Sequence, residues 1–164
     1  MIHPNMATML AFVATDASVE AGFLQRAVKA SADLSFNMIS IDRDMSTNDT
    51  LLVLANGAAG GDSVAEGSEE AALFQEALLV LCKYLAREVV RDGEGVNRLF
   101  EVKIEGAASD EEARIAARTI ASSSLVKSAV HGADPNWGRV MVALGYSGAT
   151  VDEDKLALYV NDVC

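Results

Sequence analysis

The sequence predicts a layered α/β domain of mixed sheets and helices, and three observations support this class. Apolar runs typical of strands alternate along the chain with segments whose apolar residues recur every three or four positions. Two of the expected strands follow one another directly, so a strict βαβ series is not expected. With 164 residues and 51% hydrophobic content, the chain can bury one sizeable core. We therefore expect a single domain over residues 1–164.

The first expected elements are a strand and an amphipathic helix. TMLAFVAT, residues 8–15, is short, apolar and bounded by turn-forming residues, as a mostly buried strand would be. Residues 18–32 then carry one apolar stripe at helical spacing, with Asp16 or Ser18 as the candidate N-cap.

Two neighbouring strands are expected next. FNMISID, residues 36–42, alternates enough to be a strand, and the run from Thr50 to Gly57 follows it after a polar loop, so we expect a hairpin or an adjacent pair. Ser68 is then expected to cap a long helix that ends at about Arg91.

The C-terminal half repeats the alternation. RLFEVKIEGA, residues 98–107, has the period of a strand with one wetter face. Ser109 and Glu112 have the spacing of a capping box at the start of a further helix. Pro135 is expected at the first position of a later helix, and LALYVNDV, residues 156–163, is expected to be the last strand.

Charge and hydropathy exclude several classes of protein. A formal net charge of -11 disfavours nucleic acid and anionic lipid as partners, because binding them relies on clustered Lys and Arg. The apolar runs are far shorter than the roughly 20 residues that span a bilayer, and the start MIHPN lacks a basic n-region. We therefore expect a cytoplasmic protein without a membrane segment. Cys82 and Cys164 are expected to be reduced.

Metal and phosphate sites find little support. Neither NGAAGG nor DGEGVNR has the Lys-Ser/Thr pair of a phosphate-binding loop. The acidic run of residues 42–49 lacks the glycine and glutamate of a calcium loop, so we expect its side chains to bond the local backbone. His3 and His131 are too few for a zinc site, and His131 lacks a nucleophile-elbow motif, which favours a structural role. No metal is expected.

Thr8, in the stretch PNMAT, has two interpretations. Taken alone, a β-branched residue at the start of a strand is an ordinary strand residue. Its hydroxyl can instead attack the carbonyl of the small preceding residue, Ala7, and hydrolysis of the resulting ester would free an N-terminal threonine. The α-amine of such a residue titrates at about 8, so it can serve as general base for its own hydroxyl.

Glu94 lies between Gly93 and Gly95, just beyond the expected long helix. One interpretation is a solvated loop in which one of the glycines adopts the left-handed conformation that commonly ends a helix. The other is a carboxylate that the pliable backbone brings against the ammonium group of a substrate. The spacing alone leaves both open.

Five motifs together carry a resemblance to a known family: PNMATML, STNDT, RDGEG, SLVK and GADPNWGR. They run in family order over essentially the whole chain, and PNMATML with DPNWGR is a highly specific combination. The chain closely resembles the bifunctional ornithine acetyltransferase / N-acetylglutamate synthase family of arginine biosynthesis. The resemblance implies that family's layered α/β sandwich of interleaved α and β chains, here incomplete at both ends.

The resemblance also implies a reaction. The family's precursors split themselves between the residues matching Ala7 and Thr8, so residues 1–7 would be the tail of the α chain and residues 8–164 most of the β chain. Thr8 would take an acetyl group from N-acetylornithine and pass it to glutamate, with acetyl-CoA as the donor in bifunctional members and no other cofactor. Glu94 matches a substrate-contacting glutamate, so the expected substrate-binding residues are Thr8 and Glu94.

The chain also departs from the family pattern. The upstream α segment, with its lysine and the Thr-Gly pair of the oxyanion hole, is not part of it, and neither are the C-terminal substrate contacts. Arg43 and Met45 replace a common glycine and threonine. We therefore expect the fragment to be nearly inactive alone, because each lost oxyanion donor costs on the order of 100-fold in rate. Its expected partner is the α chain, in a heterotetramer of two α and two β chains.

Two other hypotheses stay open. The chain as given could be a noncatalytic scaffold that docks onto a separate α chain. It could also be an N-terminal-nucleophile hydrolase, in which water receives the acyl group in place of an amine. The sequence does not separate these hypotheses from acetyl transfer.

Overall fold

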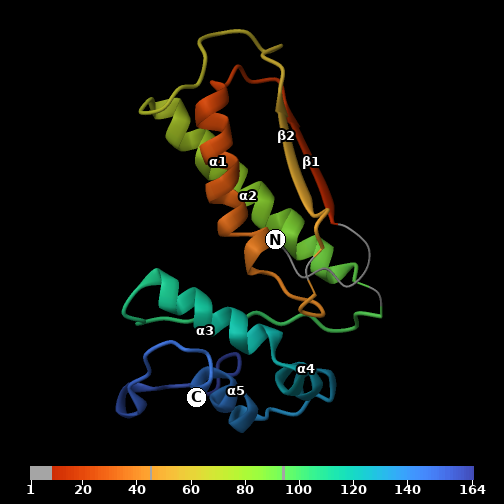
Figure 1. Ribbon diagram of the computed structural model, residues 1–164, viewed down its shortest axis with the longest axis vertical. Coiled ribbons are helices and arrows are strands. Elements are labelled where there is room, and N and C mark those ends of the chain that lie inside the picture. Colours follow the sequence, from red (N-terminus) through yellow and green to blue (C-terminus); the bar gives the residue numbers. More distant parts are fainter. Residues whose placement is uncertain (1–8, 45, 94) are drawn as a thin grey trace. The chain divides into compact units, whose positions relative to one another are not determined.

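The computed structural model describes residues 9–44, 46–93 and 95–164, and Figure 1 shows its elements. The chain forms two compact units, Met1–Glu94 and Gly95–Cys164, which are taken in turn. Ala7, Thr8 and Glu94, the predicted site residues, lie outside the described residues. The expectation of a single domain over the whole chain stays a prediction. No described helix is long and apolar enough to cross a membrane.

The first unit begins with a βαβ arrangement. Strand β1 (Leu10–Thr15) leads through helix α1 (Ala21–Asp33) to strand β2 (Thr50–Ala55), and the two strands pair in parallel, Leu10 opposite Thr50 and Thr15 opposite Ala55. Parallel neighbours need a long crossover, which α1 and the segment after it provide. The two strands therefore start at the same edge of the sheet.

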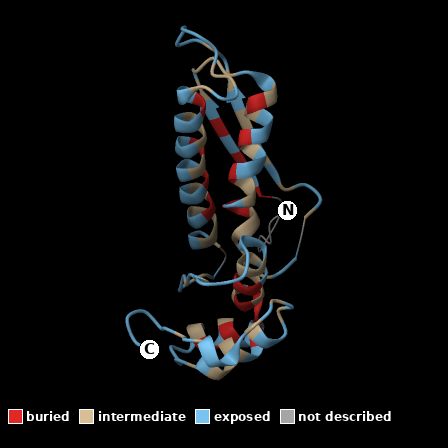
Figure 2. Cartoon of the chain, turned by 90° about the vertical axis from the view of Figure 1, so that its left-hand side faces the viewer, coloured by how far each residue is buried: buried red, intermediate tan, exposed pale blue. Residues whose placement is uncertain are grey.

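Strand β1 has one buried face and one exposed face. Ala11 and Val13 are buried, whereas Leu10 and Phe12 are 58% and 64% exposed. The buried face points toward α1 and the 23-residue helix α2 (Glu69–Arg91), which lie along one side of the sheet (Figures 1 and 2). The strand prediction for residues 8–15 is confirmed from Leu10 onward.

Helix α2 begins as predicted. The Ser68 side chain accepts a hydrogen bond from the Ala71 amide at 3.1 Å, which satisfies one of the unpaired N–H groups of the first turn. Helix α1 begins later than expected, at Ala21, and its N-cap position, Glu20, provides no side-chain cap. The Gln75 amide links the two helices by donating to Ser31 Oγ at 2.9 Å.

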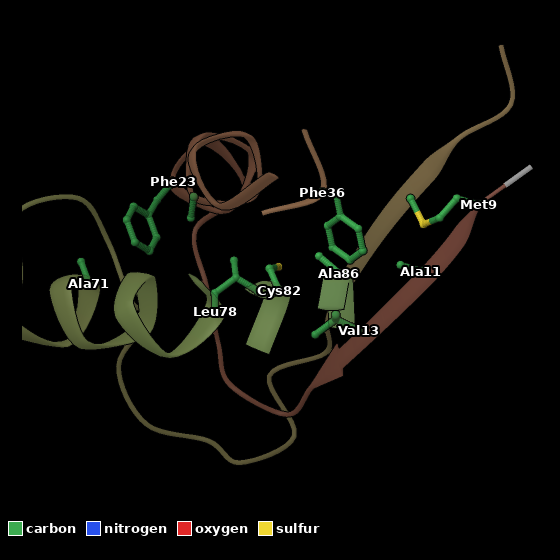
Figure 3. Packing of buried hydrophobic residues seen from close by; sticks show 10 residues of the cluster. Met9, Ala11, Val13, Phe23, Phe36, Ala71, Leu78, Cys82 and Ala86 are labelled. Carbon is green, nitrogen blue, oxygen red and sulfur yellow. The ribbon is translucent and has the colours of Figure 1, made fainter. Parts of the chain in front are cut away.

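The core of this unit forms where β1, α1, α2 and the short helix η1 (Phe36–Met38) meet (Figure 3). Phe36 and Cys82 are fully buried, and the Phe23 and Phe74 rings pack at a centroid distance of 6.1 Å. The buried cluster consists of Met9, Ala11, Val13, Phe23, Ala27, Phe36, Ala71, Leu78, Cys82 and Ala86.

The strand predicted at residues 36–42 is wrong. Residues 36–38 form η1, no strand follows in the described part of this segment, and β2 pairs with β1 instead of forming a hairpin with it. The physical reason is that the apolar run of residues 36–42 is short, and a run of this length does not distinguish a strand from a helical turn. A single turn is enough to bury Phe36. The strand predicted from Thr50 is confirmed, and Gly57 follows it in the left-handed conformation.

The second unit is helical. It contains α3 (Asp110–Ser122), α4 (Ser124–His131), α5 (Trp137–Gly145) and the short η2 (Glu153–Lys155). Buried residues from the three longer helices, Ile120, Val126 and Ala143, form its core. Ser109 caps α3 by accepting from the Glu112 amide at 3.2 Å, as predicted. The Glu112 carboxylate accepts a hydrogen bond from the Thr150 hydroxyl at 3.1 Å.

Three predictions for this unit need correction. Residues 98–107 and 156–163 form no strand among the described residues; the second segment contains only an isolated bridge between Val160 and Val163. Phe100, Val102 and Ile104 still pack on the helices, because alternation specifies a buried face and not a pairing partner. Asn136, not Pro135, borders α5 as its N-cap.

Candidate functional site at the start of the first strand

The described residue next to Thr8 is Met9, and it is held firmly. Its side chain is buried, its amide donates to Asp49 Oδ1 at 3.0 Å, and its carbonyl accepts from the Thr50 amide at 2.8 Å. These bonds fix both backbone polar groups of Met9 at the edge where β1 and β2 start. The backbone that leaves Thr8 is therefore anchored before the strand begins.

The loop before β2 is built from local side-chain bonds. Asp42 Oδ1 accepts from the Asp44 amide at 2.9 Å, and Ser46 Oγ accepts from the Asn48 amide at 3.1 Å. Such bonds replace missing backbone pairs in irregular segments. The prediction that this acidic run bonds its own backbone is confirmed for these residues. Its Met45 lies outside the described residues.

Arg43 in this loop has a φ of 76°, in the left-handed region that a residue with a Cβ seldom adopts. Glycine takes this conformation without steric cost. This geometry gives a physical reason for the common glycine that the family resemblance implies at this position.

The described residues on both sides of Glu94 form the end of α2 and the turn after it. The Asp92 and Gly93 amides donate to the carbonyls of Glu88 and Val90, at 2.9 and 3.3 Å, which closes the helix. Gly95 has a φ of 69°, and a Cβ built on it would meet nothing within 4 Å. Backbone conformation, rather than crowding, favours glycine there, in agreement with the predicted left-handed turn.

The SLVK and DPNWGR motifs meet in the second unit. Arg139 Nη1 donates to the Leu125 carbonyl in α4 at 3.1 Å. Asn136 Oδ1 caps α5 by accepting from the Arg139 amide at 3.3 Å, while its amide group donates to Asp134 at 2.9 Å. These residues hold two helices and their connecting turn in place.

Other reactive side chains are poorly suited to nucleophilic work. Burial raises the pKa of the Cys82 thiol, which keeps it protonated and weakly nucleophilic. His131 is the last residue of α4, and Gly132 follows it as the C-cap. Among the described residues, no three His, Cys, Asp or Glu side chains are grouped so as to hold a metal ion.

Asp49 is the residue that the sequence interpretation missed. It belongs to the STNDT motif, yet nothing in its spacing connected it with Thr8. The missing signal was the parallel pairing of β1 and β2, which places Asp49 beside Met9 although 40 residues separate them. The sequence pattern instead favoured residues 36–42 as the partner of β2, and so did not place β2 beside β1.

Together these features define an α/β chain with a βαβ unit, a helical unit and an anchored strand start directly after a threonine. The ArgJ family model matches residues 1–164. The arginine biosynthesis bifunctional protein ArgJ of Dehalococcoides mccartyi is 56% identical over 162 residues, and that of Symbiobacterium thermophilum is 53% identical over 163. A crystal structure of the Bacillus halodurans protein of that name is 46% identical, with a TM-score of 0.86, and the match covers 89% of this chain and 68% of that one.

The chain therefore belongs to the ArgJ family. Its layered α/β fold is the fold of the Bacillus halodurans structure, as the resemblance implied. The match covers 99% of this chain and 40% of the Dehalococcoides mccartyi and Symbiobacterium thermophilum relatives, so the chain spans less than half of their length.

Proposed function

We propose that the chain is the nucleophile-bearing part of an acetyltransferase of arginine biosynthesis, with Thr8 as the acyl acceptor. The observation that carries this proposal is the ArgJ family match over all 164 residues, which includes the PNMAT stretch around Thr8. The anchored backbone of Met9 supports it, because a nucleophile must be held in a fixed geometry to act.

The proposed sequence of steps begins with release of the nucleophile. Thr8 Oγ attacks the carbonyl carbon of Ala7, the C–N bond between the two residues breaks, and the hydroxyl proton ends on the Thr8 nitrogen. Water then hydrolyses the ester, which leaves a carboxylate on Ala7 and a free α-amine on Thr8. That amine can remove the proton from its own hydroxyl in every later cycle.

Acetyl transfer then follows a ping-pong order. Thr8 Oγ attacks the acetyl carbonyl of N-acetylornithine, and ornithine leaves with a proton on its amine. The α-amine of glutamate next attacks the acetyl ester, and N-acetylglutamate leaves. Acetyl-CoA serves as the alternative donor. In this scheme Glu94 holds a substrate ammonium group, for which a carboxylate beside the left-handed Gly95 is chemically suited.

The test uses a chimera in which these 164 residues replace the matching segment of the Dehalococcoides mccartyi relative. We expect it to transfer acetyl from N-acetylornithine to glutamate, measured as N-acetylglutamate formed. Glu94→Gln should lower kcat/KM by about 10- to 100-fold, the range for a lost charge-assisted bond to a substrate. Glu88→Gln is the matched control, because the Glu88 carboxylate pairs with Arg91 at 2.8 Å.

No transfer by a folded chimera would count against the acetyltransferase assignment. Release of free acetate without N-acetylglutamate would support the hydrolase hypothesis instead, since the same nucleophile would then pass its acyl group to water. A Glu94→Gln variant as active as the chimera would remove the role proposed for that carboxylate.

A second candidate function is a scaffold that docks onto a separate α chain, and an exposed apolar sheet face favours it. Leu10, Phe12, Leu52 and Leu54 lie on the side of β1 and β2 away from the helices and are between 41% and 64% exposed. Apolar residues gathered on one strand face are typical of surfaces covered by a partner.

This candidate predicts that the 164-residue chain associates with the separately expressed upstream segment of the relative. Size-exclusion chromatography should show one shared peak, and the double variant Phe12→Thr, Leu52→Thr should lose it. Leu73→Gln is the control, because Leu73 is 68% exposed, close to the 64% of Phe12, but lies on α2. Separate elution of the unmodified chain and the segment would argue against docking.

A further inference from the structure

The two carboxylate oxygens of Asp49 have different surroundings. Oδ1 accepts the Met9 amide at 3.0 Å. Oδ2 is buried from solvent and has no hydrogen-bond partner within the part of the chain that the structure describes. A buried polar atom without a partner costs folding free energy, so its presence in a native structure calls for an explanation.

The backbone keeps this carboxylate in place. The Thr50 amide, directly after Asp49, donates to the Met9 carbonyl at 2.8 Å, and the strand register continues from Leu10 opposite Thr50. Met9 thus has two hydrogen bonds to consecutive residues, a side-chain bond to Asp49 and a backbone bond from Thr50. The unpartnered oxygen is held at the start of β1.

Covalent connectivity brings this oxygen into reach of the reacting group. The Met9 amide that Asp49 accepts belongs to the peptide bond between Thr8 and Met9. The Thr8 nitrogen is three covalent bonds from the Met9 nitrogen, which limits their separation to about 4 Å in any conformation. A carboxylate hydrogen-bonded to one nitrogen can therefore reach the other with its second oxygen.

We propose that Asp49 is the counter-charge for the Thr8 nitrogen, holding the Met9 amide with Oδ1 and receiving the Thr8 ammonium with Oδ2. This inference rests on the proposed function of Thr8. In the first step of cleavage, the Thr8 nitrogen leaves the Ala7 carbonyl and takes up the hydroxyl proton, which gives a neutral amine. That amine then takes a second proton from water and becomes an ammonium, because an α-amine titrates at about 8.

A fixed carboxylate favours this change. Conversion of the amide into the ester is unfavourable unless the released amine is stabilised as an ammonium, and a nearby negative charge does this most strongly where water is excluded. If Asp49 had only a structural role, Oδ1 alone would be needed, as the acceptor for the Met9 amide, and the negative charge would not matter.

The experiment separates charge from shape in the chimera described above. Asp49→Asn keeps an oxygen acceptor for the Met9 amide but removes the charge, and Asp49→Ala removes both. Cleavage between Ala7 and Thr8 is followed by intact mass, and the ester is trapped with hydroxylamine. Thermal unfolding shows whether each variant folds. Glu112→Gln is the matched control, because Glu112 Oε2 is the other buried, unpartnered carboxylate oxygen among the described residues.

We expect Asp49→Asn and Asp49→Ala to slow cleavage by a similar factor, about 10- to 100-fold, and to reduce the hydroxylamine-trapped ester, while Glu112→Gln cleaves at the parent rate. Asp49→Glu keeps the charge and should cleave faster than Asp49→Asn. If the asparagine variant folds poorly, the comparison of Asp49→Glu with Asp49→Ala tests the charge in its place. Cleavage of a folded Asp49→Asn variant at the parent rate would overturn the counter-charge. A folded parent chimera that stays uncut would instead overturn the proposed function, and this inference with it.

Discussion

Replacing Thr8 by alanine in the chimera is expected to leave one uncut chain and no measurable acetyl transfer. Alanine has no hydroxyl, so neither the ester with Ala7 nor the acetyl ester can form. Loss of a covalent nucleophile typically removes several orders of magnitude of rate, the largest effect expected for any residue of this chain. Intact mass spectrometry measures the cleavage, and formation of N-acetylglutamate measures the transfer.

The matched control for this substitution is Thr15→Ala, at the other end of β1. It removes the same hydroxyl and methyl group but should leave cleavage intact. Two fragments dividing between Ala7 and Thr8, present in the parent and absent only in Thr8→Ala, would establish the nucleophile. Cleavage that persists in Thr8→Ala would return Thr8 to an ordinary strand residue.

Phe36→Ala is expected to destabilise the first unit by about 3 to 5 kcal/mol, the usual cost of removing a buried phenylalanine side chain and leaving a cavity. Phe36 is 1% exposed and belongs to the cluster with Leu78, Cys82 and Ala86 (Figure 3). A domain is stable by only about 5 to 15 kcal/mol, so the variant should unfold at much lower urea concentrations.

Phe12→Ala provides the control for this measurement, because it deletes the same atoms from a side chain that is 64% exposed. It should cost about 1 kcal/mol or less. Far-UV circular dichroism follows the whole chain, while fluorescence of the single tryptophan, Trp137, follows the second unit. A Phe36→Ala variant no less stable than Phe12→Ala would show that the Phe36 site collapses without a cavity.

The sequence predicted the helices better than the strands, for a physical reason. Helix α2 is long, its apolar stripe lies within it, and its N-cap Ser68 directly precedes it. The residues of the segment itself are therefore enough to predict the helix. The partner of β2 is decided by β1, 40 residues earlier, and no local pattern specifies that choice. The alternation at residues 98–107 predicted a strand with one wetter face. Phe100, Val102 and Ile104 do pack on the helical core, but the described residues form no strand there.

For the candidate site, sequence motifs and structure contributed different residues. Thr8 and Glu94 came from the chemistry of PNMAT and RDGEG together with the family resemblance, and their roles stay predictions. Asp49 became visible only through its hydrogen bond to Met9. A carboxylate in a loop rich in Asp, Ser and Asn is indistinguishable from its neighbours by sequence, because residues 42–49 all favour local backbone bonds.

The parallel pairing of β1 and β2 also bears on the order of events after synthesis. Contacts between residues 40 apart close a long loop, and such contacts form late because the loss of chain entropy precedes the gain from pairing. Asp49 reaches Met9 only once β2 has returned to the first strand. If Asp49 supports the chemistry at Thr8, a newly made precursor stays whole until its sheet has formed, and cleavage then reports completed folding of the first unit.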